Sequence, residues 1–412
     1  MKILVVTECF WPDIYAVNDI VEKLVLRGHS VTVLTGLPDY TTTRIPPEYK
    51  HGGNRHQNYK GADVYRVSTI ARRHGPIWRS LSYLSFAING WFKAKTHKFE
   101  EFDVIYVWEV SPVTMAVPAI ALKNRYHKPL FLYCMDIWPE CVKAMNINEG
   151  TLPYRLIHAW TKRIYRRCDH IAVSSKPFFE YMEQVNGISR DKMSYLPQFG
   201  DSSLLDTDTF KEKTDATIDL LFIGNIGKAQ NLDCLMYAMS SVKENLNSEH
   251  SSILVHLHMV GGGSEYDRIK SLCTELGLDD IVTFYGPVPF KESISFYNKA
   301  DACVLTLDGS THIGDTLPGK LQTYMAAGKP IIAAANGATM QIIEESECGM
   351  CVPAGDHEKY GQAILDYIKN TDIYKSYGSN GRDFFKKNFG EDKHFDTLET
   401  LLTEIRINDR GV

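Results

Sequence analysis

The chain has 412 residues, of which 44% are hydrophobic and 23% charged, so its composition is that of a globular protein long enough for two domains. No apolar run reaches about 18 residues, which excludes a membrane-spanning helix, and the amino terminus enters a strand too early for a secretory signal, so we expect a cytoplasmic protein. The net charge of -5 is divided unevenly: residues 1–200 hold 26 Lys and Arg against 18 Asp and Glu (+8), and the remainder holds 19 against 32 (-13). This division predicts different partners for the two halves.

The first half predicts a parallel α/β domain. A strand over residues 2–7, a helix over 18–27 and a strand over 30–35 form the β-loop-α-β opening of a doubly wound sheet. Further strands are expected over 103–108, 129–134, 170–174 and 193–196. The polar segment 199–217 predicts a linker, so we place the domain boundary near Ser203.

Two acidic residues follow strands of this domain. Glu109 follows the strand 103–108, and Asp136 follows the strand 129–134. Functional groups of open α/β sheets gather at the carboxyl ends of strands, so both are candidate catalytic residues. A helix N-cap is the structural alternative for Asp136.

Residues 66–98 form a basic stretch that is rich in aromatic and aliphatic side chains. It has no acidic residue, and its cations are Arg66, Arg72, Arg73, Arg79, Lys93, Lys95 and Lys98. This pattern is typical of a helix that lies on an anionic membrane surface. A core helix with a solvated basic rim is the alternative, because many cytosolic proteins contain one.

The second half repeats the α/β pattern with a glycine-rich loop after its first strand. The strand 220–223 precedes Gly224, Asn225, Gly227, Lys228 and Gln230, where backbone N–H groups can face a phosphate. Strands over 253–260 and 282–285 follow, the second leading to Gly286 and Val288.

Two smaller motifs in this half favour structural roles. His256 and His258 alternate along a strand without an acidic third ligand, which favours a structural role. The nine cysteines are odd in number and scattered, and Cys348 and Cys351 form a lone C-x-x-C. We interpret this pair as buried thiols, with a zinc or redox site as the alternative.

The stretch around residues 304–335 indicates an anion site. An apolar strand over 304–307 leads through a polar loop to Pro318 and Gly319, then a helix that stops at Gly328 and a strand over 330–335. The helix N-terminus presents unpaired N–H groups beside one cation, Lys320. Such a terminus is suited to a negatively charged ligand.

The run PGKLQTYMAAGKPIIA from Pro318 to Ala333 resembles the donor-binding segment of the retaining glycosyltransferases of family 4. The resemblance implies an α/β protein with the GT-B fold, in which two doubly wound Rossmann-like domains face a central cleft. It implies an acceptor-binding domain over 1–203, a nucleotide-sugar-binding domain over 204–384, and a terminal helix, about 385–412, that crosses back to the first domain.

Residue by residue, the resemblance implies a donor site made of Gly224, Asn225, Gly227, Lys228, Gln230, Gly286, Val288, Asp315, Pro318, Gly319, Lys320, Leu321 and Thr323. Asp315 and Thr323 match the family's two glutamates, so the second carboxylate, which usually takes the ribose hydroxyls, is missing. The chain departs from the family twice more. Ala16 and Val17 replace a Gly-Gly pair in the first loop, and Met135 precedes Asp136 where the family often has His.

The resemblance also implies a mechanism. Lys320 would stabilise the charge that leaves with a nucleotide diphosphate, taken to be UDP, while Asp136 or Glu109 would orient the acceptor hydroxyl. Neither a cofactor nor a metal is expected, since the family does not need one.

The chain looks most like bacterial enzymes that build O-antigen or capsule on a polyprenyl diphosphate carrier. The expected partners are therefore a nucleotide sugar, a polyprenyl-diphosphate-linked saccharide and, through 66–98, an anionic membrane on its inner face; no nucleic acid is expected. Alternatives are a GT-B nucleotide-sugar epimerase and a non-catalytic polysaccharide-assembly protein. A nicotinamide dehydrogenase is disfavoured, because no G-x-G-x-x-G follows the first strand.

Overall fold

The computed structural model describes residues 1–39, 43–72, 75–145, 147–205, 217–309 and 316–410. The chain divides into two compact units, one made of Met1–Leu196 with Phe395–Val412 and the other of Pro197–His394. The division falls earlier than the expected boundary at Ser203, and the returning segment begins later than residue 385. The reason is local packing, because Gly200 N donates to Phe389 O (3.0 Å) and Leu204 is buried in the core of the second unit.

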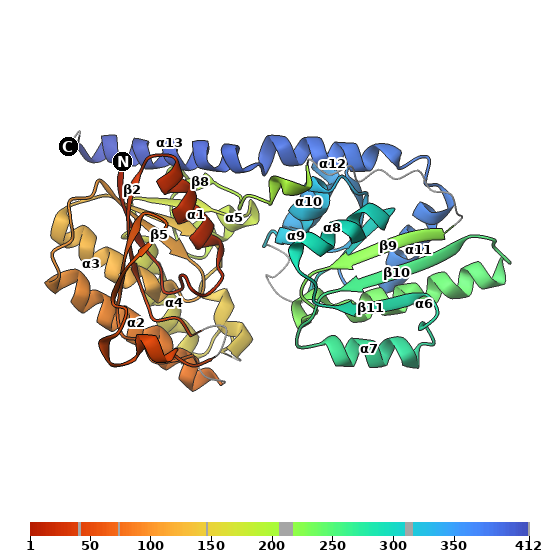
Figure 1. Ribbon diagram of the computed structural model, residues 1–412, viewed down its shortest axis with the longest axis horizontal. Helices are drawn as coiled ribbons and strands as arrows, with labels where there is room; N and C mark the ends of the chain where they lie inside the picture. The colour runs from red at the N-terminus through yellow and green to blue at the C-terminus, as the bar shows by residue number, and fades with distance from the viewer. Residues whose placement is uncertain (40–42, 73–74, 146, 206–216, 310–315, 411–412) are drawn as a thin grey trace. The chain divides into compact units, whose positions relative to one another are not determined.

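The first unit is built on an eight-stranded sheet in the part of the chain that the structure describes (Figure 1). The strand order is β3-β4-β2-β1-β5-β6-β7-β8, and only β3 and β4 pair antiparallel. The bounds are β1 (Lys2–Val6), β2 (Ser30–Thr35), β3 (His56–Tyr59), β4 (Ala62–Arg66), β5 (Val104–Glu109), β6 (Leu130–Cys134), β7 (His170–Val173) and β8 (Met193–Tyr195). The central strands are continuous apolar runs, as expected for parallel strands covered on both faces.

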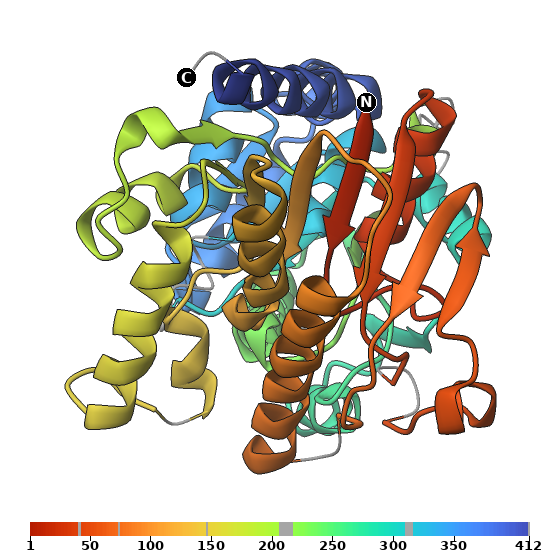
Figure 2. The ribbon, with the colours of Figure 1, turned by 90° about the vertical axis from the view of Figure 1, so that its left-hand side faces the viewer.

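Four helices of the first unit share one core with this sheet. Side chains of α2 (Pro76–Thr96), α3 (Val117–Tyr126), α4 (Leu152–Tyr165) and α5 (Pro177–Gln184) share a core cluster with β1, β5, β6 and β7. Figure 2 shows α2, in orange, beside α3. Gly90 allows this close approach, since a Cβ there would lie 2.5 Å from Pro118 Cγ.

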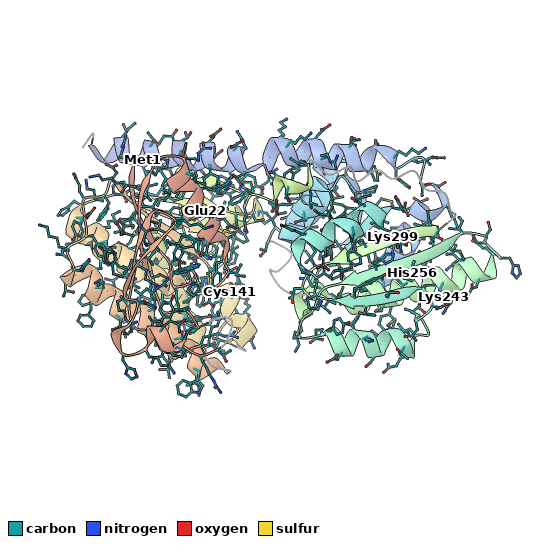
Figure 3. All side chains as sticks on the ribbon, viewed as in Figure 1. Met1, Glu22, Cys141, Lys243, His256 and Lys299 are labelled. Carbon is teal, nitrogen blue, oxygen red and sulfur yellow. The ribbon has the colours of Figure 1, made fainter. Side chains whose placement is uncertain are left out.

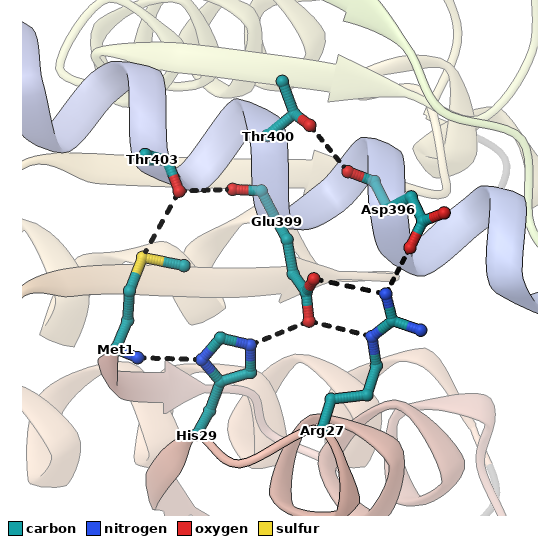
Figure 4. A network of polar contacts seen from close by, with 7 residues as sticks. All are labelled: Met1, Arg27, His29, Asp396, Glu399, Thr400 and Thr403. Carbon is teal, nitrogen blue, oxygen red and sulfur yellow. Dashed lines mark hydrogen bonds and ion pairs between the residues drawn. The ribbon is translucent and has the colours of Figure 1, made fainter.

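The terminal helix α13 (Glu391–Arg410) is held to the first unit by a polar network at the end of α1 (Ala16–Leu26) (Figure 4). Arg27 Nε donates to Glu399 Oε1 (2.9 Å), and its Nη2 contacts both Glu399 and Asp396. His29 Nε2 lies 2.8 Å from the same Glu399 oxygen. The hydrogen bonds from Arg27, with that from His29, lower the pKa of Glu399.

We expect Glu399→Gln to weaken the attachment of α13 by about 1–2 kcal/mol at neutral pH, since two charge-assisted contacts are lost. A carboxyl whose pKa is depressed by folding stabilises the fold above its unfolded pKa of about 4.3 and loses this effect as the pH falls through its folded pKa. The rates of amide hydrogen exchange in α13 of the wild type and of Glu399→Gln should therefore differ at pH 7 and converge below about pH 4.

The matched control is Glu101→Gln, which removes a pair with Lys2 at 3.7 Å whose carboxylate is 79% exposed. Such an exposed pair should contribute almost nothing. If exchange in α13 were equally slow in wild type and Glu399→Gln at pH 7, the network would not be what attaches the helix.

The second unit has a six-stranded parallel sheet within the described residues, in the order β11-β10-β9-β12-β13-β14. The strands are β9 (Thr217–Ile223), β10 (Leu254–Val260), β11 (Val282–Gly286), β12 (Ala302–Thr306), β13 (Ile331–Ala334) and β14 (Gly349–Val352). This is the doubly wound order 3-2-1-4-5-6, in which ligands bind where the order reverses, between the first and fourth strands. That switch point lies between β9 and β12.

Alternate residues of these strands face two separate cores. One core is shared with α6 (Leu232–Ser248), α7 (Tyr266–Glu275) and α11 (His357–Lys369). The other is shared with α8 (Phe290–Lys299), α9 (Gly319–Ala326), α10 (Gly337–Ser346) and α12 (Lys375–Asn388). Helices thus cover both faces, and the carboxyl ends of the strands are left to form a site.

Candidate functional site

The loops after β9 and β12 meet at the switch point of the second sheet. Thr306 Oγ1 donates to Gln230 O (2.5 Å), and Asp308 N donates to Ala229 O (3.0 Å). These contacts fix the glycine-rich loop that begins at Gly224 against the end of β12. The two segments that the sequence predicted to form a donor site therefore lie together.

Lys320 extends from the first turn of α9 into this junction. Its Nζ donates to Gln230 Oε1 and lies 4.3 Å from the centre of the Phe222 ring. A Cβ at Gly224 would touch Lys320 Cε at an ordinary 3.4 Å, and the φ of +147° is what favours glycine there. Burial lowers the pKa of Lys320 to about 7. An anion bound beside Lys320 would raise this pKa and favour the protonated ammonium over the neutral amine.

The N-terminus of α9 is not crowded by the described residues. Among the described residues no side chain caps it, and a Cβ at Gly319 would meet no atom within 4 Å. The helix is anchored by Tyr324, whose hydroxyl lies 3.0 Å from Ile223 N. The positive end of the α9 helix dipole and Lys320 thus lie at the same place.

Two residues assigned to the donor site by resemblance do not offer their side chains to it. Leu321 is fully buried in the core beneath α9, and its N–H donates to Pro318 O (3.0 Å). The Thr323 hydroxyl donates to Gly319 O (3.0 Å), one turn earlier in the helix. The assignment of Leu321 as a ligand contact is therefore wrong for its side chain, since burial removes it from any surface.

Glycines bring three loops of the second unit into contact. Gly224 N donates to Val260 O (2.9 Å) and Gly261 N donates to Gly286 O (2.8 Å). A Cβ at Gly261 would lie only 1.9 Å from Gly224 O, so that position requires glycine. The sequence motif G-G-G at 261–263 was the signal for this contact, but it was not assigned to the site, and neither was Phe222.

The remaining donor residues vary in position. Asn225 and Lys228 are exposed on the glycine-rich loop, and Gly227 is buried within it. The Val288 side chain packs against the core that contains α9. A nucleotide base bound near Gly286 would therefore be contacted by backbone groups. Asp315 lies outside the described residues.

The two candidate carboxylates of the first unit differ in accessibility. Asp136 Oδ2 accepts hydrogen bonds from Ser111 N (2.9 Å) and Ser111 Oγ (2.8 Å) at the carboxyl end of β6, and the residue is partly exposed. Glu109 has no exposed surface, and burial, with the nearby Asp136 charge, raises its pKa well above the ordinary range. A direct contact between Glu109 and an acceptor is therefore contradicted by its burial.

The basic stretch 66–98 is not a continuous surface. Arg66 ends β4 and is 2% exposed, with its guanidinium donating to Gly36 O (3.2 Å) and Trp11 O, and burial lowers its pKa to about 10. Arg72 lies 5.7 Å from the Tyr83 ring centre, and its N–H donates to Asp39 (2.5 Å). The assignment of Arg66 to a membrane-facing basic stretch is wrong because the residue is buried, and Arg72 contacts Tyr83 and Asp39 of the same unit. Arg73 lies outside the described residues.

Helix α2 nevertheless presents a broad apolar face outward. Phe86, Ala87 and Ala94 face the core, whereas seven large side chains on other faces are at least 39% exposed: Ile77, Trp78, Leu81, Leu84, Ile88, Trp91 and Phe92. Lys95 is exposed and Arg79 partly so. A merely solvated rim does not account for this surface.

His256 and His258 have structural partners. His258 Nε2 lies 2.8 Å from Asp219 Oδ1 and its Nδ1 lies 2.8 Å from the Tyr285 hydroxyl, while His256, labelled with Lys299 in Figure 3, contacts Thr283. Burial lowers the pKa of both histidines. Within the described ranges, no three His, Cys, Asp or Glu side chains gather as a metal site requires.

Cys348 is buried, and burial raises its thiol pKa to about 11 and that of Cys351 to about 12. Both therefore remain thiols at neutral pH, which lowers their reactivity.

Comparisons with known proteins agree with this architecture. Residues 16–203 match the family model described as Glycosyltransferase Family 4, and residues 206–384 match Glycosyl transferases group 1. The putative colanic acid biosynthesis glycosyl transferase WcaI of Escherichia coli K12 is 20% identical over 358 residues, covering 82% of this chain and 84% of the relative.

Two solved structures share the fold. Sucrose-phosphate synthase of Thermosynechococcus elongatus superposes with a TM-score of 0.74 at 18% identity, covering 98% of both chains. HepE of Anabaena, solved with UDP, gives a TM-score of 0.69 at 15% identity, covering 98% of this chain and 100% of that one.

Two doubly wound units, together with the likeness to these structures, define the GT-B fold. The chain belongs to the family 4 glycosyltransferases, whose two models together match 16–203 and 206–384. This membership favours a transferase over the epimerase and the non-catalytic assembly protein. Among the described residues, no helix is both long and apolar enough to span a membrane.

Proposed function

We propose that this glycosyltransferase moves a sugar, with retention of configuration, from a nucleotide diphosphate sugar to a lipid-linked saccharide during surface-polysaccharide synthesis. The observation that carries the proposal is the meeting of Lys320, the Gly224 loop and the N-terminus of α9 at the second switch point. A cation and a helix N-terminus at one place suit a leaving diphosphate. The relative WcaI, by its name, acts in colanic acid synthesis, which supports the polysaccharide class.

The donor is UDP-linked in this proposal, with support from HepE, a protein of the same fold that was solved with UDP. The lysine and the helix dipole supply the positive charge, so the mechanism requires no metal ion or cofactor. The acceptor attacks from the face that the nucleotide leaves, and the departing phosphate takes its proton. Asp136, which is partly exposed at the end of β6, orients the acceptor hydroxyl.

Donor identity is tested by thermal unfolding with a panel of nucleotide sugars. A ligand that binds only the folded protein at 100 times its Kd adds about 2.7 kcal/mol, which raises the melting temperature by several degrees. A rise with UDP-sugars and none with GDP- or CMP-sugars is expected. No rise with any nucleotide sugar would contradict the donor assignment.

The lipid-linked acceptor would be a polyprenyl diphosphate saccharide, which requires the enzyme to work at the inner face of a membrane. The outward apolar face of α2 supports this location, because aromatic and aliphatic side chains beside Arg79 and Lys95 suit an anionic lipid surface. Helix α4 of the same unit has a similar stripe. Leu152, Leu156 and Trp160 are 67%, 64% and 43% exposed at helical spacing, near Arg155 and Arg163.

We expect the protein to sediment with anionic vesicles more than with neutral ones, and less as salt shortens the Debye length. Trp91→Ser with Phe92→Ser should reduce binding about tenfold or more, because two aromatic side chains no longer enter the headgroup layer. Ile373→Ser is the matched control, since Ile373 is 69% exposed in the second unit. Equal binding to both vesicle types, or a stable dimer that the double substitution dissolves, would contradict the membrane assignment.

A further inference from the structure

Lys320 depends on a single residue for its polar contacts in the described chain. Its Nζ donates to Gln230 Oε1 and otherwise lies over the Phe222 ring, whose centre is 4.3 Å away. Burial is what lowers the pKa of Lys320 to about 7, and no carboxylate among the described residues opposes that shift. The charge state of Lys320 therefore depends on burial and on one amide oxygen.

The backbone of Gln230 is fixed independently of its side chain. Gln230 N donates to Gly227 O (2.9 Å), and Gln230 O accepts from Thr306 Oγ1 (2.5 Å) at the end of β12. The next residue, Asn231, has a left-handed backbone conformation (φ 44°) and directly precedes α6. A substitution that changes only the Gln230 side chain should therefore leave the loop in place.

The amide group of Gln230 is able to contact Lys320 and an anion at the same time. An ammonium group only donates hydrogen bonds, so it fixes the amide with Oε1 turned toward Nζ. Gln230 is partly exposed, and its Nε2 has no hydrogen-bond partner in the part of the chain that the structure describes. The N–H groups of the amide are therefore available for a ligand oxygen beside the ammonium.

We propose that Gln230 is a positioning residue for Lys320: its amide oxygen holds the ammonium toward a bound diphosphate, and its amide nitrogen donates a hydrogen bond to the same anion. The proposal rests on the function proposed above and adds the residue that controls the charge of Lys320. A neutral amide suits this task. A carboxylate at this position would pair with the lysine and repel a diphosphate, and a second cation would disfavour the ammonium.

Other charged groups of the site have little influence on Lys320. The titratable residues of the surrounding loops and of α9 are Lys228, Glu265, Asp308 and Tyr324. None of them contributes to the lowered pKa of Lys320. Glu265 pairs with Arg268 (2.6 Å), and burial raises the pKa of Tyr324 well above the ordinary range, so its hydroxyl stays neutral. A changed titration of Lys320 after substitution of Gln230 can therefore be assigned to the amide.

The first measurement is an NMR titration of isotope-labelled lysine in the whole protein without ligand, with the Lys320 signal assigned by its absence from Lys320→Ala. Gln230→Met keeps the length of the side chain but removes the amide, so the Lys320 midpoint should fall by about one pH unit. Gln230→Glu should raise it by about one pH unit or more, because an opposite charge favours the ammonium. The matched controls are Gln362→Met and Gln362→Glu at an exposed position of α11, which should not move it.

The second measurement is the affinity for UDP-glucose by calorimetry between pH 6 and pH 9. Gln230→Met should bind about tenfold more weakly at pH 7, since the lysine is less charged and one hydrogen bond is lost, and its loss of affinity with rising pH should begin about one pH unit lower than in the wild type. Gln230→Glu should also bind at least about tenfold more weakly, with that loss displaced to higher pH.

The two measurements separate a positioning role from a structural one. A structural role would weaken binding of UDP-glucose equally at every pH and leave the Lys320 midpoint unchanged in both Gln230 variants, and that result would overturn the proposal. An unchanged midpoint with normal affinity would overturn it as well, while the proposed function would stand. If the wild type bound no UDP-sugar, the donor assignment and the hydrogen bond to its diphosphate would both be contradicted, whereas the NMR titration would still decide the contact between Gln230 and Lys320.

Discussion

Replacement of Lys320 by alanine is expected to lower the rate of sugar transfer at least about a hundredfold, because one preorganised contact to a developing anion can contribute about 3 kcal/mol. The Lys320 side chain contacts Gln230 and lies over the Phe222 ring at the switch point. No described side chain caps α9, the helix whose first turn contains Lys320. Its position allows contact with a diphosphate held by the Gly224 loop. Steady-state rates with a saturating donor provide the measurement.

The matched control is Lys270→Ala, which removes an exposed lysine from α7 of the same unit. Near-normal turnover in a folded Lys320→Ala protein would remove the lysine from the mechanism. The pH dependence of donor affinity is a second test that does not depend on turnover. In the protein without ligand the pKa of Lys320 is about 7, and a bound anion must raise it. The affinity of the wild-type protein for a nucleotide sugar should therefore weaken above pH 7, by up to about tenfold per pH unit.

This pH dependence should vanish in Lys320→Ala, whose binding should be weak throughout. A nucleotide sugar is a better probe than a free nucleotide diphosphate, because a terminal phosphate itself titrates near pH 6. An unchanged pH dependence in the variant would show that another group titrates on binding.

Asp136→Asn is expected to lower transfer about a hundredfold while leaving donor affinity within about twofold, because a carboxylate that orients the acceptor hydroxyl belongs to the acceptor side. Donor Kd by calorimetry and transfer rate are measured in parallel. Weaker donor binding with normal transfer would contradict the assignment.

Asp136 also holds the loop at Ser111, so its role needs a control. Ser111→Ala removes the hydroxyl contact but keeps the carboxylate. If Ser111→Ala lost as much activity as Asp136→Asn, the aspartate would act by positioning that loop. A small effect in Ser111→Ala would leave the carboxylate itself as the group that matters.

The predicted parallel strands were found because they are continuous apolar runs, and glycine-rich loops also follow β9 and β10. The strand over 30–35 was predicted with the bounds that the structure gives, and the strand over 220–223 lies within β9. The hairpin of β3 and β4 was missed, since HQNY is polar and mostly exposed at a sheet edge. Because this hairpin was missed, Arg66 was assigned to the membrane-facing basic stretch, although it is the last residue of β4.

The parts of the candidate site that are formed by loop backbone and a helix N-terminus could be predicted from the sequence. Glycines after β9 and a lysine at the start of α9 identified the two loops, and the structure brings them together. Burial was harder to predict. Glu109 and Leu321 both follow motifs that carry function, yet each side chain lies in a core.

The most direct test of the whole account is a transfer assay with a UDP-sugar and a synthetic polyprenyl-diphosphate saccharide in anionic vesicles, with NMR of the product. The account predicts a new glycosidic bond with the same anomeric configuration as the donor, formed only when both substrates are present. Inversion of configuration would contradict the retaining mechanism. A changed sugar nucleotide without acceptor, or no product with any UDP-sugar and acceptor, would contradict the proposed transfer itself.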